Sequence, residues 1–282
     1  MKGKLLRYFY KNKEFIGFLD DENIITPLDI DSDMNNLILN YEKLYKCVSN
    51  ERVSLDDVEI LSPIKAPLQD VICLGINYME HARESMRFKK EVFDDKRDEA
   101  IYFSKRINAF NKHKGSFHIR NLTNELDYEA ELVVIIGKDC ANVSKENALD
   151  YVFGYTISDD ISARDIQLKH KQWYGGKSLE GSCPLGPCIV LRDSIDASKL
   201  SIKCYVNGEL RQNSNTSELI FDIPYAISEL SSYFTLKAGS VISMGTPSGS
   251  GMGFCPPKFL KVGDEITCEI EGIGKLTTYI KA

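Results

Sequence analysis

The sequence predicts an α+β fold that is rich in β-strands, with one main domain and a small N-terminal region. Apolar or alternating runs of strand length recur along most of the chain, and few segments have the periodicity of a helix. The runs do not alternate strictly with helices, and no glycine-rich dinucleotide-binding fingerprint is present after the first strand. A doubly wound parallel sheet requires such features. We therefore expect a mixed, β-rich domain.

The N-terminal region is expected to contain short strands and one helix. The stretches "LLRYFY" and "EFIGFLD" alternate in the manner of strands around a turn at residues 11–13, and residues 34–45 suit a helix. The stretch "LSPIKAPLQD" then brings two prolines close together, which is typical of a linker. We place a boundary near residue 65, which divides the chain into a small region, 1–65, and a main domain, 66–282.

The main domain is expected to contain many strands and two helices. Helical character is found in "NYMEHARESMRF" and in residues 223–233. Asn207 and Gly208 lie between alternating flanks, which is a strong signal for a β-hairpin. The predicted strands are "DVICLG", "AIYFSK", "AELVVIIG", "VFGYTIS", "PCIVLRD", "IKCYVNGELRQ", "GSVISMG" and "DEITCEIEGIGKLTTYI".

Composition excludes several classes of protein. The chain of 282 residues has a net charge of -6, which gives no electrostatic support for binding a nucleic acid. The sequence contains no run of about 18 apolar residues, so no membrane span is expected. The N-terminus lacks the apolar core of a signal peptide, so a cytoplasmic location is expected. None of the 8 cysteines forms a CxxC pair, which favours free buried thiols over a zinc ribbon or a disulfide framework.

The stretch "ELDYEAELVVIIGKD" places Asp127, Glu129 and Glu131 at every second position, leading into an apolar run. On a strand, residues two apart share a face, so the three carboxylates are expected to point the same way. Adjacent carboxylates repel one another and resist burial, and therefore need a compensating positive charge. An exposed sheet edge with solvated acids is the alternative.

A second acidic group favours a metal site over an exposed edge. The stretch "SDDISARD" places Asp159, Asp160 and Asp165 just after the apolar strand "VFGYTI". Acids at the ends of two neighbouring strands can meet. Oxygen-only ligands suit a hard cation such as Mg²⁺ or Mn²⁺ rather than zinc.

Three further features suggest chemistry. His81 and Glu84 lie three residues apart on a predicted helix, where a carboxylate can orient an imidazole for general base catalysis, although many such pairs lie on the surface. Lys177 lies in "WYGGKSLEGSCPLGP", which predicts an ordered loop near a ligand, unless it is an ordinary surface lysine. The glycine-rich "MGTPSGSGMGF" matches no phosphate-binding signature.

These features occur within a longer resemblance to the fumarylacetoacetate hydrolase family. The resemblance covers roughly residues 71–280, and its stretches occur in the family's order. They are "GINYMEHARE", "DYEAELVVIIGK", "GYTISDDISARDIQ", "GKSLEGSCPLGP", "YVNGELRQNSNTSELIF", "LKAGSVISMGTPSGSGMGF" and "FLKVGDEITCEIEGIGKL". The resemblance implies a mixed β-sandwich or roll of the fumarylacetoacetase C-terminal type, built around a divalent metal, usually Mg²⁺, and usually a homodimer.

The resemblance also implies roles for individual residues. The metal ligands would be Glu129, Glu131 and Asp160, with Asp127 in a supporting position or anchoring the backbone. His81 and Glu84 would form a dyad on a short lid helix, and Lys177 would be the active-site lysine. The positions expected to contact substrate are Lys105, Gln167 and Thr246.

The chain departs from the family pattern at two positions that are not proposed ligands. Asp159 stands where the family often has Asn, and Glu180 stands where it often has Asp. Both departures bear on substrate specificity rather than on metal binding. The charged stretch 88–99 is expected to belong to the lid.

The expected function is metal-dependent hydrolysis of a C–C bond in a small 2-oxo acid such as an acylpyruvate or fumarylpyruvate. In this mechanism the substrate chelates the metal, His81 removes a proton from water, and Lys177 helps to hold the departing enolate. Isomerisation or tautomerisation of hydroxymuconate-type diacids and decarboxylation of oxaloacetate are alternatives that the same site can support. A non-catalytic metal-binding protein on the same fold is an alternative of another class.

Overall fold

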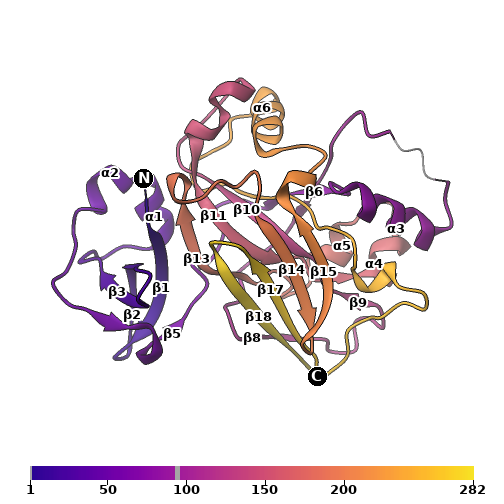
Figure 1. Cartoon of the computed structure of the whole chain (residues 1–282), viewed down its shortest axis with the longest axis horizontal. Coiled ribbons are helices and arrows are strands. Elements are labelled where there is room, and N and C mark those ends of the chain that lie inside the picture. Colours follow the sequence, from indigo (N-terminus) through magenta and orange to yellow (C-terminus); the bar gives the residue numbers. More distant parts are fainter. Residues whose placement is uncertain (1, 93–95) are drawn as a thin grey trace.

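The computed structural model describes residues 2–92 and 96–282, and it confirms the predicted β-rich α+β fold. The strands form an 11-stranded sheet, a 5-stranded sheet and a 2-stranded ribbon. The N-terminal region lies at one end of the molecule, and helices α3, α4 and α5 lie together at the other end (Figure 1). These helices are α3 (Met79–Lys89), α4 (Arg164–Lys169) and α5 (Tyr174–Lys177).

The N-terminal strands extend the large sheet. The predicted turn joins β1 to β2 through Lys11 and Asn12, both with positive φ. Strand β1 also pairs with β13 of the main domain, with Leu5 opposite Ile189. Residues 61–70 contain no regular element, and the boundary near residue 65 stays a prediction. The strands are β1 (Lys4–Tyr10), β2 (Lys13–Leu19), β3 (Ile24–Pro27), β4 (Val53–Ser54) and β5 (Glu59–Ile60).

The single helix predicted over residues 34–45 is wrong. The structure has two short helices, α1 (Met34–Leu39) and α2 (Tyr41–Leu44), separated at Asn40. Asn40 has a non-helical backbone, with φ -121° and ψ 24°. Its side-chain amide donates to the side chain and the carbonyl of Asn36, which offers the backbone a local alternative to continuing the helix.

The main-domain part of the large sheet is ordered β13–β11–β10–β16–β6–β7. All neighbours in it are antiparallel except β16 and β6, which are parallel. Every residue of β10 and β11 is buried, as their continuous apolar sequence predicts for strands covered on both faces. The bounds are β13 (Leu185–Leu191), β11 (Val152–Asp159), β10 (Ala130–Ile136), β16 (Val241–Ser243), β6 (Val71–Gly75) and β7 (Ile101–Lys105).

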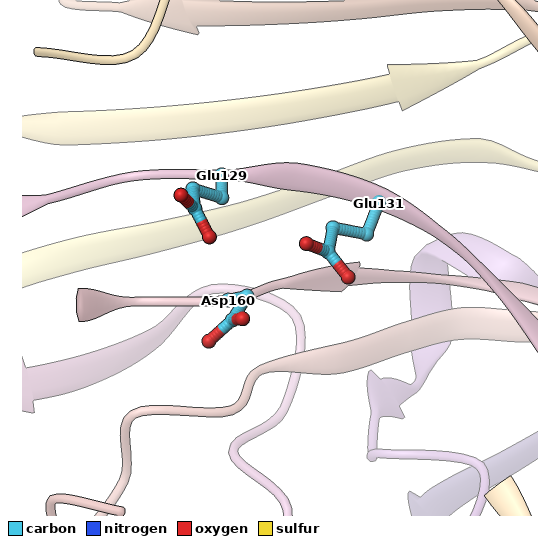
Figure 2. Close-up of side chains that lie close together, drawn as sticks. All are labelled: Glu129, Glu131 and Asp160. Atoms are coloured by element: carbon cyan, nitrogen blue, oxygen red, sulfur yellow. The ribbon is translucent and has the colours of Figure 1, made fainter. Parts of the chain in front are cut away.

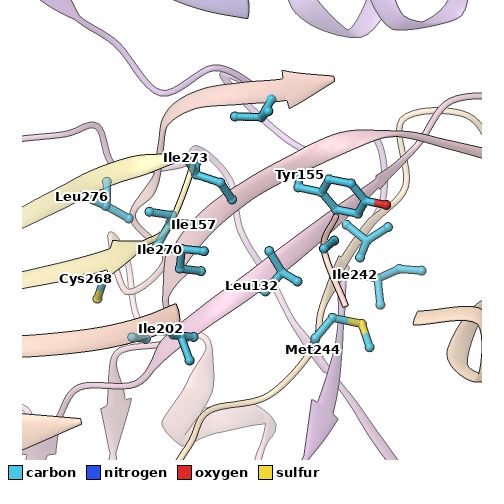
Figure 3. Close-up of a cluster of buried hydrophobic side chains, with 14 of the residues drawn as sticks. Leu132, Tyr155, Ile157, Ile202, Ile242, Met244, Cys268, Ile270, Ile273 and Leu276 are labelled. Atoms are coloured by element: carbon cyan, nitrogen blue, oxygen red, sulfur yellow. The ribbon is translucent and has the colours of Figure 1, made fainter. Parts of the chain in front are cut away.

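The 5-stranded sheet packs across β10 and β11 and completes the core. Leu132 and Ile157 from the large sheet meet apolar side chains of the smaller one, among them Ile202, Cys268 and Leu276 (Figure 3). The predicted hairpin at Asn207 and Gly208 is confirmed, because both residues have positive φ between β14 and β15. The strands are β15 (Glu209–Asn215), β14 (Ser201–Val206), β17 (Glu265–Ile270), β18 (Gly274–Lys281) and β8 (Gly115–His118).

The remaining predicted helix is confirmed as α6 (Ile223–Tyr233). Asp222 caps it by accepting from the Tyr225 amide at 2.8 Å. Short 3₁₀ turns occur at Leu55–Asp57, Lys145–Tyr151, Arg192–Ser194, Thr216–Glu218 and Gly251–Gly253. Within the described ranges, none of the helices has the length and apolar character needed to cross a membrane.

The strand expected to carry three acids is interrupted. Ribbon strand β9 (Leu126–Asp127) pairs with β12 (Ser162–Ala163), and β10 begins only at Ala130. Asp127 therefore lies on the ribbon, before the break. It shares Arg164 with Glu129, whereas the carboxylates that converge with Asp160 are those of Glu129 and Glu131.

Candidate metal centre and active site

Three buried carboxylates converge at one end of β10 and β11. Glu129 directly precedes β10, Glu131 lies within it, and Asp160 directly follows β11. Because Ala130 lies opposite Asp159 in the antiparallel pair, the sequence motifs of the two strands meet at this end. One oxygen of each carboxylate lies within 4.8 Å of the others. Figure 2 shows the three carboxylates turned toward a common space.

Basic side chains surround this cluster. The Lys177 ammonium lies 2.5 Å from Oε2 of Glu129 and 2.7 Å from Oδ2 of Asp160. Lys105 lies 2.5 Å from the other oxygen of Asp160, and Arg164 lies 2.5 Å from Oε1 of Glu129. The compensating positive charge that the sequence required is therefore supplied by three buried cations.

The balance of charge differs between the two glutamates. Burial by itself would raise the pKa of Glu129, but Arg164 and Lys177 outweigh it and hold the pKa below its usual range. The pKa of Glu131 is raised by burial and by the nearby charges of Asp160 and Glu129. Glu131 accepts hydrogen bonds from the hydroxyl of Ser243 and the amide of Gly245. Both hydrogen bonds reach Oε2 of Glu131, and they come from neutral donors rather than from a cation.

The donor set fits a hard divalent cation. It offers only carboxylate oxygens, from residues that are 1–3% exposed. A cation there would relieve the like-charge repulsion that raises the pKa of Glu131. The chemistry of the ligands suits Mg²⁺ and Mn²⁺ equally.

Asp127 anchors the glycine-rich loop instead of joining the cluster. Its carboxylate accepts from the amides of Gly251 at 2.6 Å and Met252 at 3.1 Å, and from Nε of Arg164 at 2.9 Å. Arg164 thereby links Asp127 to Glu129. A side chain on Gly251 would place its Cβ 2.6 Å from the Asp127 carboxylate, so this close approach requires glycine.

His81 and Glu84 lie on α3, over the cluster. His81 is 4% exposed, and its Nε2 lies 3.8 Å from Oε1 of Glu129. Its Nδ1 lies 3.8 Å from Glu84, which is too long for a hydrogen bond, and has no hydrogen-bonding partner among the described residues. Both oxygens of Glu84 accept from the Gly249 amide at 3.0 Å, so this carboxylate docks α3 onto the glycine-rich loop.

A single cavity joins α3 to the carboxylates. Its lining combines polar and apolar groups, and the polar part includes His81, Glu129, Glu131, Lys177, Gln167 and Thr246. The apolar wall includes Leu74, Phe88, Phe103, Trp173 and Met252. Lys105 was expected to contact substrate, but it donates to Asp160 and to the carbonyls of Ile161 and Ser182 and is not one of the described lining residues.

Two predicted substrate contacts line the cavity but are held by protein partners. The Gln167 side-chain carbonyl accepts from Arg164 at 3.0 Å. The Thr246 hydroxyl donates to the Ala130 carbonyl at 2.9 Å and accepts from Gln212 at 2.8 Å. Lys177 is the last residue of the short helix α5, whereas the glycines before it and the prolines after it had predicted an ordered loop.

The chain is strained where it enters α3. Ile76, which lines the cavity, has a φ of 54°, a region that β-branched residues rarely adopt. The next residue, Asn77, is buried and holds the turn with hydrogen bonds to Phe221 and to the Met244 carbonyl. This turn sets the position from which α3 reaches over the carboxylates.

Arg164 was not predicted as a site residue, although it lies in the same stretch as Asp160 and Asp165. The available signal was an arginine adjacent to Asp165 and three residues before a candidate substrate-contacting glutamine. The aromatic wall was not predicted either, since Trp173 and Phe103 come from separate segments and meet only in the fold, with ring centroids 5.2 Å apart.

The family model described as "Fumarylacetoacetate (FAA) hydrolase C-terminal" matches residues 70–281, and the chain belongs to the fumarylacetoacetate hydrolase family. Hydrolases, isomerases and tautomerases occur among its relatives.

Particular relatives span most of the chain. "Oxaloacetate tautomerase YisK" of Bacillus subtilis is 44% identical over 229 residues, which are 80% of this chain and 74% of that protein. A fumarylacetoacetate hydrolase domain-containing protein 2 homolog of Dictyostelium discoideum is 43% identical over 247 residues, covering 83% and 78% of the two chains.

Solved structures agree over the whole length. The fumarylacetoacetate hydrolase of Exiguobacterium antarcticum superimposes with a TM-score of 0.84 at 34% identity, covering 99% of both chains. Maleylpyruvate hydrolase of Sphingobium sp. SYK-6, in complex with manganese(II) ion and pyruvate, gives 0.77 at 25% identity, covering 99% of this chain and 98% of that one.

Proposed function

We propose that the protein is a divalent-metal-dependent enzyme that transfers a proton at the carbon next to the keto group of a small 2-oxo acid. One observation carries the proposal: the His81 imidazole and two of the three converging carboxylates, those of Glu129 and Glu131, line the same cavity. Moving a proton on such a carbon requires a base beside the carbon and stabilisation of the negative charge that forms on oxygen. The similarity to an oxaloacetate tautomerase supports this reaction.

The chain supplies each of these requirements. Glu129, Glu131 and Asp160 would hold a divalent cation, which would supply Lewis-acid chemistry toward a bound 2-oxo acid. His81 takes the proton from one position and returns it to the other. Glu84, 3.8 Å from Nδ1 of His81, stabilises the imidazolium that forms in between. The Lys177 ammonium stabilises negative charge on the substrate oxygen.

The position of α3 favours proton transfer over hydrolysis. His81 is 4% exposed, and Glu84 fixes its helix to the glycine-rich loop. The apolar wall faces the same space. Exclusion of bulk water lets the proton return to the substrate without attack by water on a neighbouring carbonyl.

Hydrolysis of a C–C bond, the reaction expected from the sequence, is the second candidate. It is favoured by the proximity of Glu84 to His81, because a histidine beside a carboxylate can take a proton from a water molecule that attacks the more distant carbonyl. The similarity to a maleylpyruvate hydrolase supports it. Decarboxylation of oxaloacetate is the third reaction that the same groups can support.

One assay distinguishes these reactions. The purified protein is mixed with the enol of oxaloacetate in Mg²⁺ or Mn²⁺, with and without a chelator, and loss of the enol is followed by ultraviolet absorbance. Pyruvate formation reports decarboxylation, and an acylpyruvate panel that includes maleylpyruvate reports hydrolysis. We expect accelerated ketonisation that the chelator abolishes. Turnover unaffected by the chelator would overturn the metal-dependent mechanism.

Replacement of the base tests the role of His81. His81→Ala should lower turnover by about two to four powers of ten, the usual contribution of a general acid or base, with metal affinity retained. Glu80→Gln is the matched control, since Glu80 is exposed on the same helix and pairs with Arg83. Equal turnover in His81→Ala and Glu80→Gln would remove His81 from the mechanism.

A non-catalytic metal-binding protein remains the alternative of another class. It predicts metal binding by calorimetry with no turnover on any substrate of the panel. We also propose that the protein acts as a homodimer in the cytoplasm and binds neither nucleic acid nor membrane. Sedimentation equilibrium at micromolar concentration tests the dimer, and a monomer would contradict it.

A further inference from the structure

Strand β15 buries a single residue, and that residue is polar. Gln212 is fully buried, whereas the other residues of β15 are exposed or half-buried. Burial of a polar side chain costs free energy unless its donors and acceptors find partners. The contacts of the Gln212 amide should therefore explain why an apolar side chain does not occupy this position.

The hydrogen-bond ladder between β10 and β16 ends before it reaches Ala130. The register that pairs Val133 with Ser243 would continue to Ala130 opposite Thr246. Strand β16 ends at Ser243, however, and Gly245 has a φ of 89°. Ala130 is fully buried, so its N–H and C=O groups need partners from outside this ladder.

The side chains of Gln212 and Thr246 take the place of the missing strand. Oε1 of Gln212 accepts from the Ala130 amide at 3.0 Å, and the Thr246 hydroxyl donates to the Ala130 carbonyl at 2.9 Å. Nε2 of Gln212 donates to the Thr246 hydroxyl at 2.8 Å, which closes a ring of three hydrogen bonds. Nε2 also donates to the Pro247 carbonyl at 2.8 Å, so both amide hydrogens of Gln212 have an acceptor.

This ring holds the backbone between two of the converging carboxylates. Ala130 lies between Glu129 and Glu131, so its N–H and C=O groups belong to the two peptide units that join these glutamates. In the first unit, the Glu129 carbonyl accepts from the Asp160 amide at 2.8 Å. Since the N–H and C=O groups of a trans peptide point in opposite directions, Asp160 holds this unit from one side and Gln212 holds it from the other.

We propose that Gln212 is a positioning residue of the metal centre. By holding the Ala130 amide and the Thr246 hydroxyl, it fixes the spacing and the direction of the Glu129 and Glu131 carboxylates. Gln212 is not one of the described lining residues of the cavity, and it has no part in the proton transfer. This inference rests on the proposed function, since it assumes that the two glutamates bind a divalent cation.

The test opens the ring and measures metal binding without turnover. Gln212→Met keeps the length of the side chain but removes the acceptor of the Ala130 amide. The dissociation constant for Mn²⁺, measured by calorimetry, should rise about 10- to 100-fold, the usual effect of losing a residue that supports a metal ligand. The electron paramagnetic resonance spectrum of bound Mn²⁺ depends on the arrangement of its ligands and should change. In the metal-free protein, the Ala130 amide hydrogen should exchange faster by NMR.

A double variant tests whether Gln212 acts through the ring. Thr246→Val removes the other side chain of the ring with little change of shape, and it should also weaken Mn²⁺ binding. Because a ring is opened by the loss of either member, the two effects should not multiply in the double variant. Effects that multiply fully would contradict the action of Gln212 through Thr246 and Ala130.

Ile202→Val is the matched control, because Ile202 is buried in the same 5-stranded sheet and its shortening lowers stability without removing a hydrogen bond. Thermal unfolding verifies that each variant folds. Ile202→Val should leave the Mn²⁺ affinity and spectrum unchanged. Wild-type affinity and spectrum in Gln212→Met, or equal losses in Gln212→Met and Ile202→Val, would overturn the proposal. Failure of the wild type to bind Mn²⁺ would count against the proposed function, whereas unchanged exchange of the Ala130 amide in Gln212→Met would count against the ring itself.

Discussion

The ammonium of Lys177 lies 2.5 Å from a carboxylate oxygen of Glu129, a residue that the resemblance assigns as a metal ligand. The same ammonium lies 2.7 Å from Asp160, another residue of that set. Two effects on the pKa of Lys177 oppose each other. Burial by itself would lower this pKa, but the charges of Asp160 and Glu129 outweigh burial and raise it. A lysine that neutralises the ligands is also a cation that competes with a metal for them.

Lys177→Met should therefore strengthen metal binding in the absence of substrate. Removing one positive charge from the cluster lowers the repulsion felt by a dication, and we expect the dissociation constant for Mg²⁺ to fall about tenfold, or by roughly 1.4 kcal/mol. In chelator the same variant should unfold at a lower temperature, because Glu129 and Asp160 lose a buried partner. Calorimetry and thermal unfolding measure the two effects.

Lys171→Met is the matched control for Lys177→Met, since Lys171 is exposed in the preceding segment. It should change neither quantity. Weaker Mg²⁺ binding in Lys177→Met would show that the lysine organises the carboxylates for the metal rather than competing with it.

Glu131→Gln should separate metal binding from folding. Burial and the charges of Asp160 and Glu129 raise the pKa of Glu131, so a neutral amide of the same shape removes repulsion from the metal-free protein. Unfolding in chelator should occur at an equal or higher temperature than in the wild type. The rise in unfolding temperature on adding Mg²⁺, expected for the wild type, should disappear.

The affinity of Glu131→Gln for Mg²⁺ should fall by more than about 100-fold. That factor is the largest loss of affinity expected when the replaced residue only supports a metal ligand and does not bind the metal itself. A control must not disturb a buried hydrogen bond. This excludes Gln212→Glu, because the Gln212 side chain accepts from the Ala130 amide. Glu180→Gln serves instead, since Glu180 is exposed. An unchanged Mg²⁺ affinity in Glu131→Gln would exclude Glu131 from the ligands.

Much of the centre could be predicted because its residues are local to two strand ends. The alternation of Glu129 and Glu131 and the acids that follow the next strand are visible in the sequence, and antiparallel pairing brings them together. The position of Asp127 could not be predicted in this way. The break between β9 and β10 arises from the pairing of Asp127 with Ser162, which no local pattern encodes.

Side-chain partners were the least predictable part of the site. Lys105 and Lys177 are distant in sequence from the acids that they neutralise, at separations of 55 and 48 residues from Asp160 and Glu129. Arg164 joins the site only because α4 begins next to the ribbon. Charge balance requires that such cations exist, but only the fold determines which ones they are.

Asp159→Asn should stabilise the protein at neutral and alkaline pH. One oxygen of Asp159 accepts from the Glu129 amide at 3.0 Å, the other is buried without a partner among the described residues, and burial raises the pKa to about 7. Since the folded pKa lies above the unfolded value of about 4, stability is lost as pH rises from about 4 through 7. Asparagine keeps the accepting oxygen and removes this loss.

The comparison is made by thermal unfolding in chelator at pH 5 and pH 8. The advantage of Asp159→Asn should be greater at pH 8, by roughly 2–4 °C for each kcal/mol. Asp165→Asn is the control, because that carboxylate accepts from Thr123 and Asn124 at the surface of the ribbon. An advantage of the same size at both pH values would show that ionisation of Asp159 is not its cause.

Gly253→Ala should disturb the active site without touching any residue that lines the cavity. A Cβ at Gly253 would lie 2.6–2.8 Å from the Glu84 carboxyl group, which holds α3 on the glycine-rich loop. The carboxylate must therefore move, and His81, three residues away on the same helix, must move with it. Misplacement of a catalytic group by about 1 Å costs on the order of 100-fold in rate.

The matched control for Gly253→Ala is Gly175→Ala, where a Cβ would meet only Ile166, at 3.6 Å. Hydrogen exchange of residues 79–89 reports the docking of α3 independently of turnover. We expect faster exchange and slower turnover in Gly253→Ala, and wild-type behaviour in Gly175→Ala. Faster exchange with unchanged turnover would mean that α3 need not be docked for the reaction, which would contradict the role given to His81.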